Sequence, residues 1–122
     1  MTVTTVPSSP VLHSARFGLT TAAVQAEGDR SVVVLRGEAD FSSTSVVSDV
    51  LSWVLTRGAG DVIVDLAELT FMDTATGHVL AEGRALFERS GRHLSFRSPS
   101  RLAFRVLHMC ALADLVEDAA AV

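Results

Sequence analysis

One short apolar run constrains the fold of this chain more than any other part of it. Residues 61–66 read Asp-Val-Ile-Val-Asp-Leu, which places aliphatic side chains on both faces of an extended segment. A strand that is apolar on both faces is typical of a sheet centre covered by helices on both sides. The run therefore predicts a central strand in a layered α/β fold, with helices on both sides of it.

The patterns on either side of this strand alternate between strand and helix types. Further strands are expected at 17–24, 31–36 and 93–96, because these stretches are short and rich in apolar residues. Helices are expected at 42–56, 73–90 and 99–110, each with an apolar stripe at helical spacing. This order predicts a single-domain α/β sandwich with a mixed, mostly parallel sheet of four to five strands and about four helices.

The apolar stripes also predict which helix faces turn inward. The residues expected on these faces are Leu80, Gly83, Leu86 and Phe87 in one helix, and Leu102, Val106, Met109 and Cys110 in the last. The last helix is expected to start at a Ser98-Pro99 cap. Residues 1–16 are rich in Thr, Ser and Pro and predict a flexible tail before a domain spanning 17–122.

Composition limits the chemistry that the chain can perform. The formal net charge is −4 over 122 residues, and all ten basic residues are Arg. This charge balance offers no basic field to nucleic acid, and the absence of Lys excludes a Walker-type lysine and a Schiff-base mechanism. The N-terminus does not resemble a leader and no apolar run reaches membrane-spanning length, so we expect a cytoplasmic protein without membrane contact.

The histidines and the cysteine form no pattern typical of a metal or catalytic site. His13, His78, His93 and His108 fall on different expected elements, with no i, i+4 pair and no Cys–His spacing. Cys110 is the only cysteine and is expected to be buried and inert on an apolar helix face. We therefore expect no metal, no cofactor and no internal disulfide.

Three motifs follow one another along the chain, namely Gly37-Glu38-Ala39-Asp40, the run 62–66 with Phe-Met-Asp at 71–73, and residues 109–115. Together they resemble the STAS family, in particular its anti-sigma-factor antagonists. Gly37-Glu38-Ala39-Asp40 is similar to the family's Gly-Glu-Leu-Asp turn. The run 62–66, followed by Phe-Met-Asp at 71–73, resembles the family's central strand and the loop leading to its switch site. Residues 109–115, Met-Cys-Ala-Leu-Ala-Asp-Leu, resemble the closing Thr-Gly-Leu-x-x-Leu-type segment. The resemblance runs from about residue 17 to the C-terminus and implies the STAS fold.

The resemblance also implies a phosphorylation site at the start of the second expected helix. The family's acceptor is a Ser within Asp-Ser-Ser-Gly, where this chain reads Asp73-Thr74-Ala75-Thr76-Gly77. A gapless alignment places Thr74 on the acceptor, whereas a shift of one residue makes Thr76 the acceptor. From the residues alone, a helix cap is the favoured interpretation of Asp73 and Thr74, and only the resemblance moves it towards a phosphate acceptor. Capping and phosphate acceptance are compatible.

The family implies a partner-binding face around this site. Its expected residues are Glu38, Asp40, Asp73, Thr74, Ala75, Thr76, Gly77 and His78. The implied partner is an anti-sigma factor with a GHKL-type Ser/Thr kinase fold, which binds the unphosphorylated chain and releases it once Thr74 carries phosphate. A PP2C-type phosphatase would reverse the reaction. The chain itself would be a monomer or weak dimer and not an enzyme, affecting sigma-factor-dependent transcription.

Two other hypotheses remain beside the phospho-switch. The chain departs from the family at Ala75 and Thr76, which favours a constitutive STAS interaction or scaffold module without a switch. An enzyme or a receiver domain with a phosphoaspartate is disfavoured. A receiver relies on a lysine that this chain lacks, and no Ser-His-Asp or paired-carboxylate arrangement is present.

Overall fold

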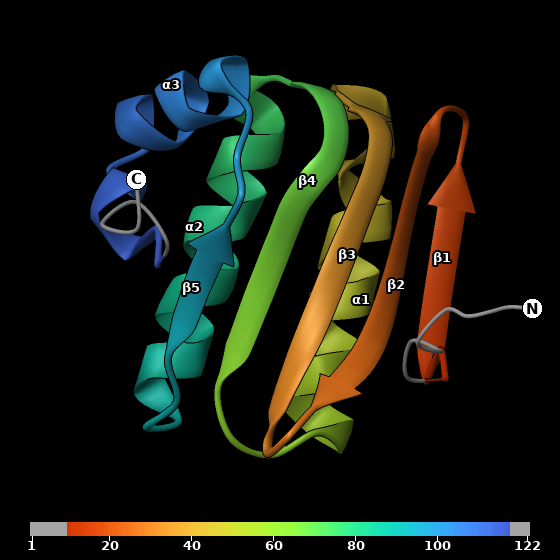
Figure 1. The fold of residues 1–122 in the computed structure, drawn as a ribbon, viewed down its shortest axis with the longest axis vertical. Coiled ribbons are helices and arrows are strands. Elements are labelled where there is room, and N and C mark those ends of the chain that lie inside the picture. Colours follow the sequence, from red (N-terminus) through yellow and green to blue (C-terminus); the bar gives the residue numbers. More distant parts are fainter. Residues whose placement is uncertain (1–9, 118–122) are drawn as a thin grey trace, which may run out of the picture.

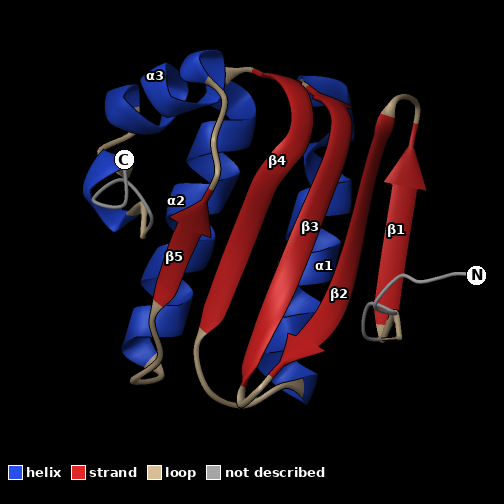
Figure 2. Ribbon diagram, viewed as in Figure 1, coloured by secondary structure: helices blue, strands red, loops and turns tan. Residues whose placement is uncertain are grey.

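The computed structural model describes residues 10–117, which form a five-stranded mixed sheet with its helices packed on one face (Figures 1 and 2). The elements are β1 (His13–Phe17), β2 (Thr20–Glu27), β3 (Arg30–Ala39), η1 (Phe41–Ser43), α1 (Thr44–Arg57), β4 (Val62–Met72), α2 (Thr74–Arg89), β5 (Leu94–Arg97), α3 (Arg101–Met109) and η2 (Ala113–Leu115). The strand order is β1-β2-β3-β4-β5. The predicted α/β fold with a mixed sheet is confirmed, with three α-helices and two short 3-10 helices in the described part.

The N-terminal region differs from the expectation because it contains a hairpin and not a single edge strand. β1 and β2 pair antiparallel around a turn at Gly18 and Leu19, and β2 pairs antiparallel with β3. The strand expected at 17–24 therefore spans this turn, and the expected tail of residues 1–16 includes most of β1. Residues 1–9 of that tail lie outside the described residues. Two of the four strand pairings, β1–β2 and β2–β3, are antiparallel, while β3–β4 and β4–β5 are parallel.

The central strand β4 is buried on both faces, but helices cover only one of them. Val62, Val64 and Leu66 face the helices and belong to the main core. Ile63 points to the other face, where it is buried with Val32 and Val34 in a small second cluster. The expectation of helices on both sides is therefore wrong. A long apolar strand can also be buried beneath long charged side chains, whose methylene groups cover apolar surface.

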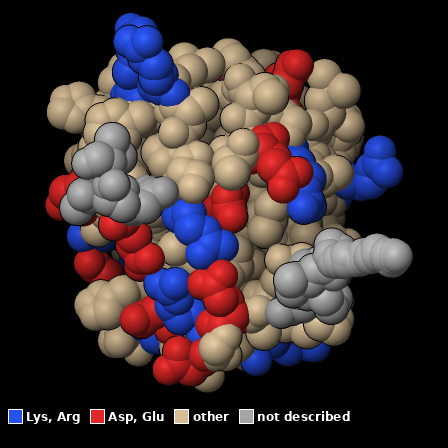
Figure 3. Space-filling view, viewed as in Figure 1, with Lys and Arg blue, Asp and Glu red and all other residues tan. Residues whose placement is uncertain are grey.

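These charged side chains form a network across the open face of the sheet (Figure 3). Arg97 on β5 pairs with Asp65 at 3.2 Å and with Glu27 at 3.1 Å. Arg30 pairs with Glu27 and Glu117 at 3.0 Å each. Hydrogen bonds from Arg30 and Arg97 lower the pKa of Glu27. The network joins β2, β3, β4, β5 and the segment after η2, and we name it the sheet-face network.

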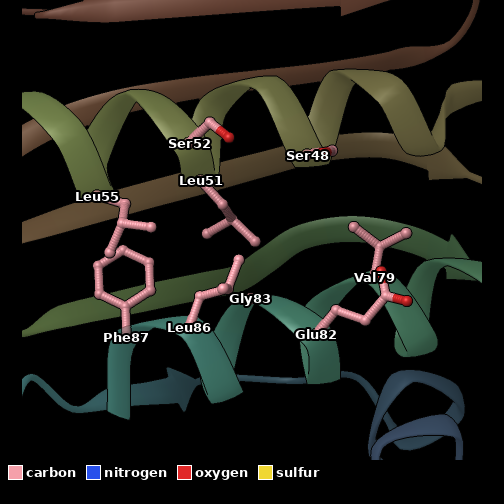
Figure 4. A pocket seen from close by; sticks show the side chains of 9 residues that line it. All are labelled: Ser48, Leu51, Ser52, Leu55, Val79, Glu82, Gly83, Leu86 and Phe87. Carbon is pink, nitrogen blue, oxygen red and sulfur yellow. The ribbon is translucent and has the colours of Figure 1, made fainter. Parts of the chain in front are cut away.

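Helices α1 and α2 pack closely because a glycine lies at their contact (Figure 4). A Cβ atom on Gly83 of α2 would lie 2.7 Å from Leu51 Cδ1 of α1, so any other residue would require the Leu51 side chain to shift. Leu80, Gly83 and Phe87 are buried as predicted. Leu86 is instead 44% exposed and borders a shallow groove between the two helices, so its predicted inward position is wrong.

Helix α3 begins later than expected, and its buried face differs from the predicted one. Ser100 is the N-cap and accepts from the Ala103 N–H, whereas Ser98 lies outside the helix with φ 57°. The buried residues of α3 are Ala103, Val106 and Leu107. Of the expected inward residues only Val106 is buried, since Cys110 is half-buried and Leu102 and Met109 are exposed. The buried residues lie opposite the polar stripe of Arg101, Arg105 and His108, whereas the predicted Leu102 and Met109 border that stripe.

Candidate functional site

Asp73 joins the two loops that the sequence motifs identified. Its Oδ1 accepts from the Thr76 backbone N–H at 3.0 Å and from Thr76 Oγ1 at 3.1 Å, which caps the N-terminus of α2. Its Oδ2 accepts from the Phe41 N–H at 3.0 Å, and its own N–H donates to the Ala39 carbonyl at 3.2 Å. The cap of α2 is therefore also the contact that holds the β3–α1 loop against it.

The Gly37-Glu38-Ala39-Asp40 motif has a steric explanation. Gly37 has φ 91°, and a Cβ atom there would lie 1.8 Å from the Leu19 carbonyl oxygen, so no other residue fits. The Glu38 N–H donates to that same carbonyl at 3.1 Å, which fixes the β1–β2 turn beside the motif. Asp40 caps η1 by accepting from the Ser42 N–H at 3.0 Å and from Ser42 Oγ at 2.6 Å.

A buried pair of hydroxyls supports this loop from beneath. Thr20 Oγ1 donates to the Glu38 carbonyl, and a second hydrogen bond of 2.8 Å joins it to Ser43 Oγ. Thr20 and Ser43 are both buried, so their polar atoms are satisfied inside the fold. The geometry of the motif thus depends on residues from β2 and η1 that the sequence analysis did not select.

Exposure separates the two candidate acceptor threonines. Thr76 is fully buried, and its hydroxyl is held by Asp73. Thr74 is exposed at the first position of α2, and its hydroxyl has no hydrogen-bond partner among residues 10–117. A transferred phosphate needs an accessible oxygen, so the structure favours Thr74, as the gapless alignment does.

The remaining expected partner-binding residues divide into surface and buried positions. Glu38 and His78 are exposed, and Asp40, Asp73 and Ala75 are half-buried. Gly77 is buried like Thr76, so these two shape the site from below and do not present a contact surface, contrary to the expectation. A Cβ atom on Gly77 would lie 2.6 Å from Cys110 Sγ and 3.1 Å from Val106 Cγ1, both near the end of α3.

The surface around Thr74 is acidic and also carries exposed apolar side chains. Within the described part of the chain, Glu38, Asp40 and Asp73 form no ion pair. Phe41, whose backbone is bonded to Asp73, is 75% exposed. Phe41 was not predicted from the sequence, because an aromatic residue before a helix gives no indication of whether it is buried. We name Glu38, Asp40, Phe41, Asp73 and Thr74 the switch face.

Among the described residues, we looked for a metal site, an activated cysteine and a membrane-spanning helix. They contain no group of three or more His, Cys, Asp or Glu side chains that could hold a metal ion. Burial raises the pKa of the Cys110 thiol. No helix within residues 10–117 has the length and apolar character needed to cross a membrane.

Solved structures similar to this one include several anti-sigma factor antagonists. The antagonist SpoIIAA in its unphosphorylated form superimposes with a TM-score of 0.70 at 18% identity, covering 79% of this chain and 85% of that one. An antagonist from Mycobacterium paratuberculosis gives 0.67 at 20%, covering 78% and 80%. The phosphorylated form of the Bacillus protein SpoIIAA gives 0.65 at 16%, covering 79% and 88%. At these identities the likeness shows a shared fold.

Sequence comparison identifies the family directly. No curated protein matches the chain significantly. A family model with the description "Mlab, STAS domain" matches residues 22–117, which is most of the chain and includes β2 to η2 except for the first residues of β2. On this match, and with the fold in agreement, the chain belongs to the STAS domain family.

Proposed function

We propose that this protein is an anti-sigma-factor antagonist, a protein-binding switch that is turned off by phosphorylation of Thr74. One observation carries the proposal: Thr74 presents a free hydroxyl at a helix N-terminus, next to an aspartate that is fixed by three neighbouring donors. The unphosphorylated chain binds an anti-sigma factor with a GHKL-type kinase fold. That partner transfers phosphate from ATP to Thr74, and a PP2C-type phosphatase in the cytoplasm removes it.

The fold can accept a phosphate at Thr74 without unfolding. Among the described residues, the backbone N–H groups of Thr74 and Ala75 have no hydrogen-bond partner, as is usual in the first turn of a helix. Such groups and the helix dipole favour a negative charge. A phosphate adds about −1.5 to −2 charges near pH 7 and can accept from these donors. The helix therefore stays folded while its surface changes.

The same phosphate is poorly tolerated at an interface. It stands beside the carboxylate of Asp73 and close to the β3–α1 loop that Asp73 holds. A partner that packs against a neutral hydroxyl must then desolvate or repel a dianion, which costs about 2–5 kcal/mol for a mismatched buried charge. This converts to roughly a 30-fold to several-thousand-fold loss of affinity. Phosphorylation thus releases the partner through the surface, without a change of fold.

Binding measurements with three variants test the switch. The partner is the kinase purified from source cells by following its transfer of phosphate to this chain. Thr74→Ala is expected to bind it as the wild type does, and Thr74→Asp at least tenfold more weakly. Ser52→Asp adds the same charge to an exposed position in the middle of α1 and serves as the matched control. Equal affinity of Thr74→Asp and Ser52→Asp would contradict the switch.

A constitutive interaction module is the second candidate function. Two observations favour it. Ala75 and Thr76 replace the Ser and Gly of the switch motif, and the description of the matching family model names Mlab and no antagonist. In this case the switch face still binds a partner, but the partner transfers no phosphate to Thr74. Binding of an unmodified partner that is insensitive to Thr74→Asp and sensitive to Phe41→Ala would identify this function.

A further inference from the structure

Helix α3 carries an exposed surface that the fold does not explain. Three large apolar side chains on it are exposed, namely Leu102 (40%), Phe104 (40%) and Met109 (65%). Arg101, Arg105 and His108 are exposed on the same helix. We name these six residues the α3 patch. In Figure 1 α3 lies at the end of the molecule where β4 and β5 reach their carboxyl ends, which is also the end where α2 begins.

The α3 patch is positive although the chain as a whole is negative. Residues 89–113 contain five of the ten arginines and no Asp or Glu, while the net charge of the chain is −4. Arg92 and Arg97 in this segment are held by backbone carbonyls and by the sheet-face network. Arg101 and Arg105, in contrast, form no ion pair or hydrogen bond within residues 10–117. The patch therefore offers two free guanidinium groups.

The arrangement of the patch defines what would cover it. Positions 101, 105 and 108 follow each other at spacings of four and three, so these side chains form one stripe along the helix. Phe104 lies on one side of this stripe and Leu102 with Met109 on the other. An acidic strip with apolar side chains on both flanks complements this surface, because carboxylates pair with guanidinium groups in a two-pronged geometry.

The chemistry favours a different protein as the occupant. Arg, aromatic residues and Met are the types enriched where proteins bind one another. A second copy packing α3 against α3 would bring the two Arg stripes together, which is repulsive. A lipid surface is less suited, since the apolar side chains flank a charged stripe and do not form one continuous face.

The α3 patch lies near the start of α2, which carries Thr74 of the switch face. Cys110 and Val106 near the end of α3 pack against Gly77, which is in the first turns of α2 after Thr74. Met109 directly precedes Cys110, and His78 directly follows Gly77 and is exposed. A partner of ordinary interface size, about 800 Å² on each side, can therefore cover both surfaces together.

We propose that the α3 patch is a docking surface for an acidic, apolar segment of a protein. This inference rests on the proposed function in one respect, namely that the segment belongs to the same partner that contacts Thr74. Docking at the α3 patch is independent of phosphate, so it sets the affinity for the partner while Thr74 sets the response to phosphorylation.

Crosslinking in source cells tests the occupant directly. A photoreactive benzoylphenylalanine replaces Phe104 in one variant, Ser42 beside the switch face in a second, and Ala85 on the exposed side of α2 as a control. Position 104 is expected to crosslink to a peptide rich in Asp, Glu and apolar residues, in the same protein that position 42 captures. A crosslink from 104 to phospholipid, to a second copy, to a peptide without acidic residues, or to nothing overturns the inference.

Charge reversal then measures the contribution of the stripe with the crosslinked protein as the purified probe. Arg101→Glu with Arg105→Glu is expected to weaken binding at least tenfold, and Arg89→Glu, an exposed arginine in the last turn of α2, by less than twofold. Equal effects of the two changes would contradict docking at α3. An acidic crosslink at 104 without any at 42 would support the α3 patch and contradict the proposed function. Thermal unfolding of each variant shows that it is folded.

Discussion

The contact between α2 and α3 can be tested by a double substitution at Gly77 and Cys110. A Cβ atom on Gly77 would lie 2.6 Å from Cys110 Sγ, far inside normal contact distance. Gly77→Ala should gain about 1 kcal/mol of helix propensity but lose about 1–3 kcal/mol by overpacking. The net expectation is a loss of about 0–2 kcal/mol in the free energy of unfolding. In the Cys110→Ala background the sulfur is gone, and the nearest remaining atom is Val106 Cγ1 at 3.1 Å.

In that background Gly77→Ala should be neutral or stabilising by up to about 1 kcal/mol, so the two changes should couple by about 1–2 kcal/mol. Urea unfolding of the four proteins, followed by the fluorescence of Trp53, measures this coupling. Trp53 is the only tryptophan, and it stacks on His13 with ring centroids 5.0 Å apart, so unfolding changes its surroundings. A coupling below about 0.3 kcal/mol would refute the claim that α3 rests on Gly77.

Three further predictions concern individual residues. Ala111 follows α3 with φ 61°. Ala111→Gly should raise the free energy of unfolding by about 0.5–1 kcal/mol, because the relief of roughly 1–2 kcal/mol of strain outweighs a cost of about 0.4–1 kcal/mol from the larger entropy of the unfolded chain. An unchanged or lower melting temperature would contradict this. Hydrogen bonds from Ser95 and Arg30 lower the pKa of Glu117, and bonds from Arg30 and Arg97 lower that of Glu27. Since each folded-state pKa is below the unfolded value of about 4.3, their stabilisation is present above that pH and is lost as the pH falls through the folded value. Glu117→Gln should therefore make urea stability less dependent on pH between 5 and 3, and an identical pH profile would count against the sheet-face network. Asp73→Ala should cost about 1–2 kcal/mol and accelerate amide hydrogen exchange at Phe41, whereas unaltered exchange there would show that Asp73 does not hold the β3–α1 loop.

The central strand shows how far a sequence pattern reaches. The run at 62–66 correctly predicted a strand buried on both faces, because burial requires apolar side chains on both. It did not reveal what covers each face. Ion pairs such as Arg97–Asp65 join residues 32 positions apart, and nothing local in the sequence indicates such a pairing.

Helix faces were only partly predicted. In α2 the apolar positions are sparse, so their spacing selected Leu80 and Phe87 correctly. In α3 the polar residues Arg101, Arg105 and His108 lie on one side, and the buried Ala103, Val106 and Leu107 lie opposite them. The sequence therefore contained the signal for the buried face, which the predicted stripe through Leu102 and Met109 missed. Leu102 and Met109, which were expected to face inward, are exposed and belong to the α3 patch.

The candidate site was partly predictable for a related reason. The motifs around Gly37 and Asp73 lie 36 residues apart in the sequence, and only the parallel pairing of β3 with β4 brings them together. Once paired, the Asp73 carboxylate reaches the Phe41 N–H, a contact that the sequence did not predict. The sequence also left Thr74 and Thr76 as alternatives. The first turn of α2 separates them, since positions two residues apart differ by about 200° around the helix, which places Thr74 outward and Thr76 inward.

The measurement that tests the central claim most directly is the position of phosphate on the chain. The purified protein is incubated with ATP and lysate from its source cells, and its peptides are then mapped by mass spectrometry. Phosphate on Thr74, absent from a Thr74→Ala variant, is the predicted result. Phosphate on Thr76 would contradict the assignment from exposure and restore the shifted alignment. An active lysate that leaves both threonines unmodified would contradict the switch and favour the constitutive module.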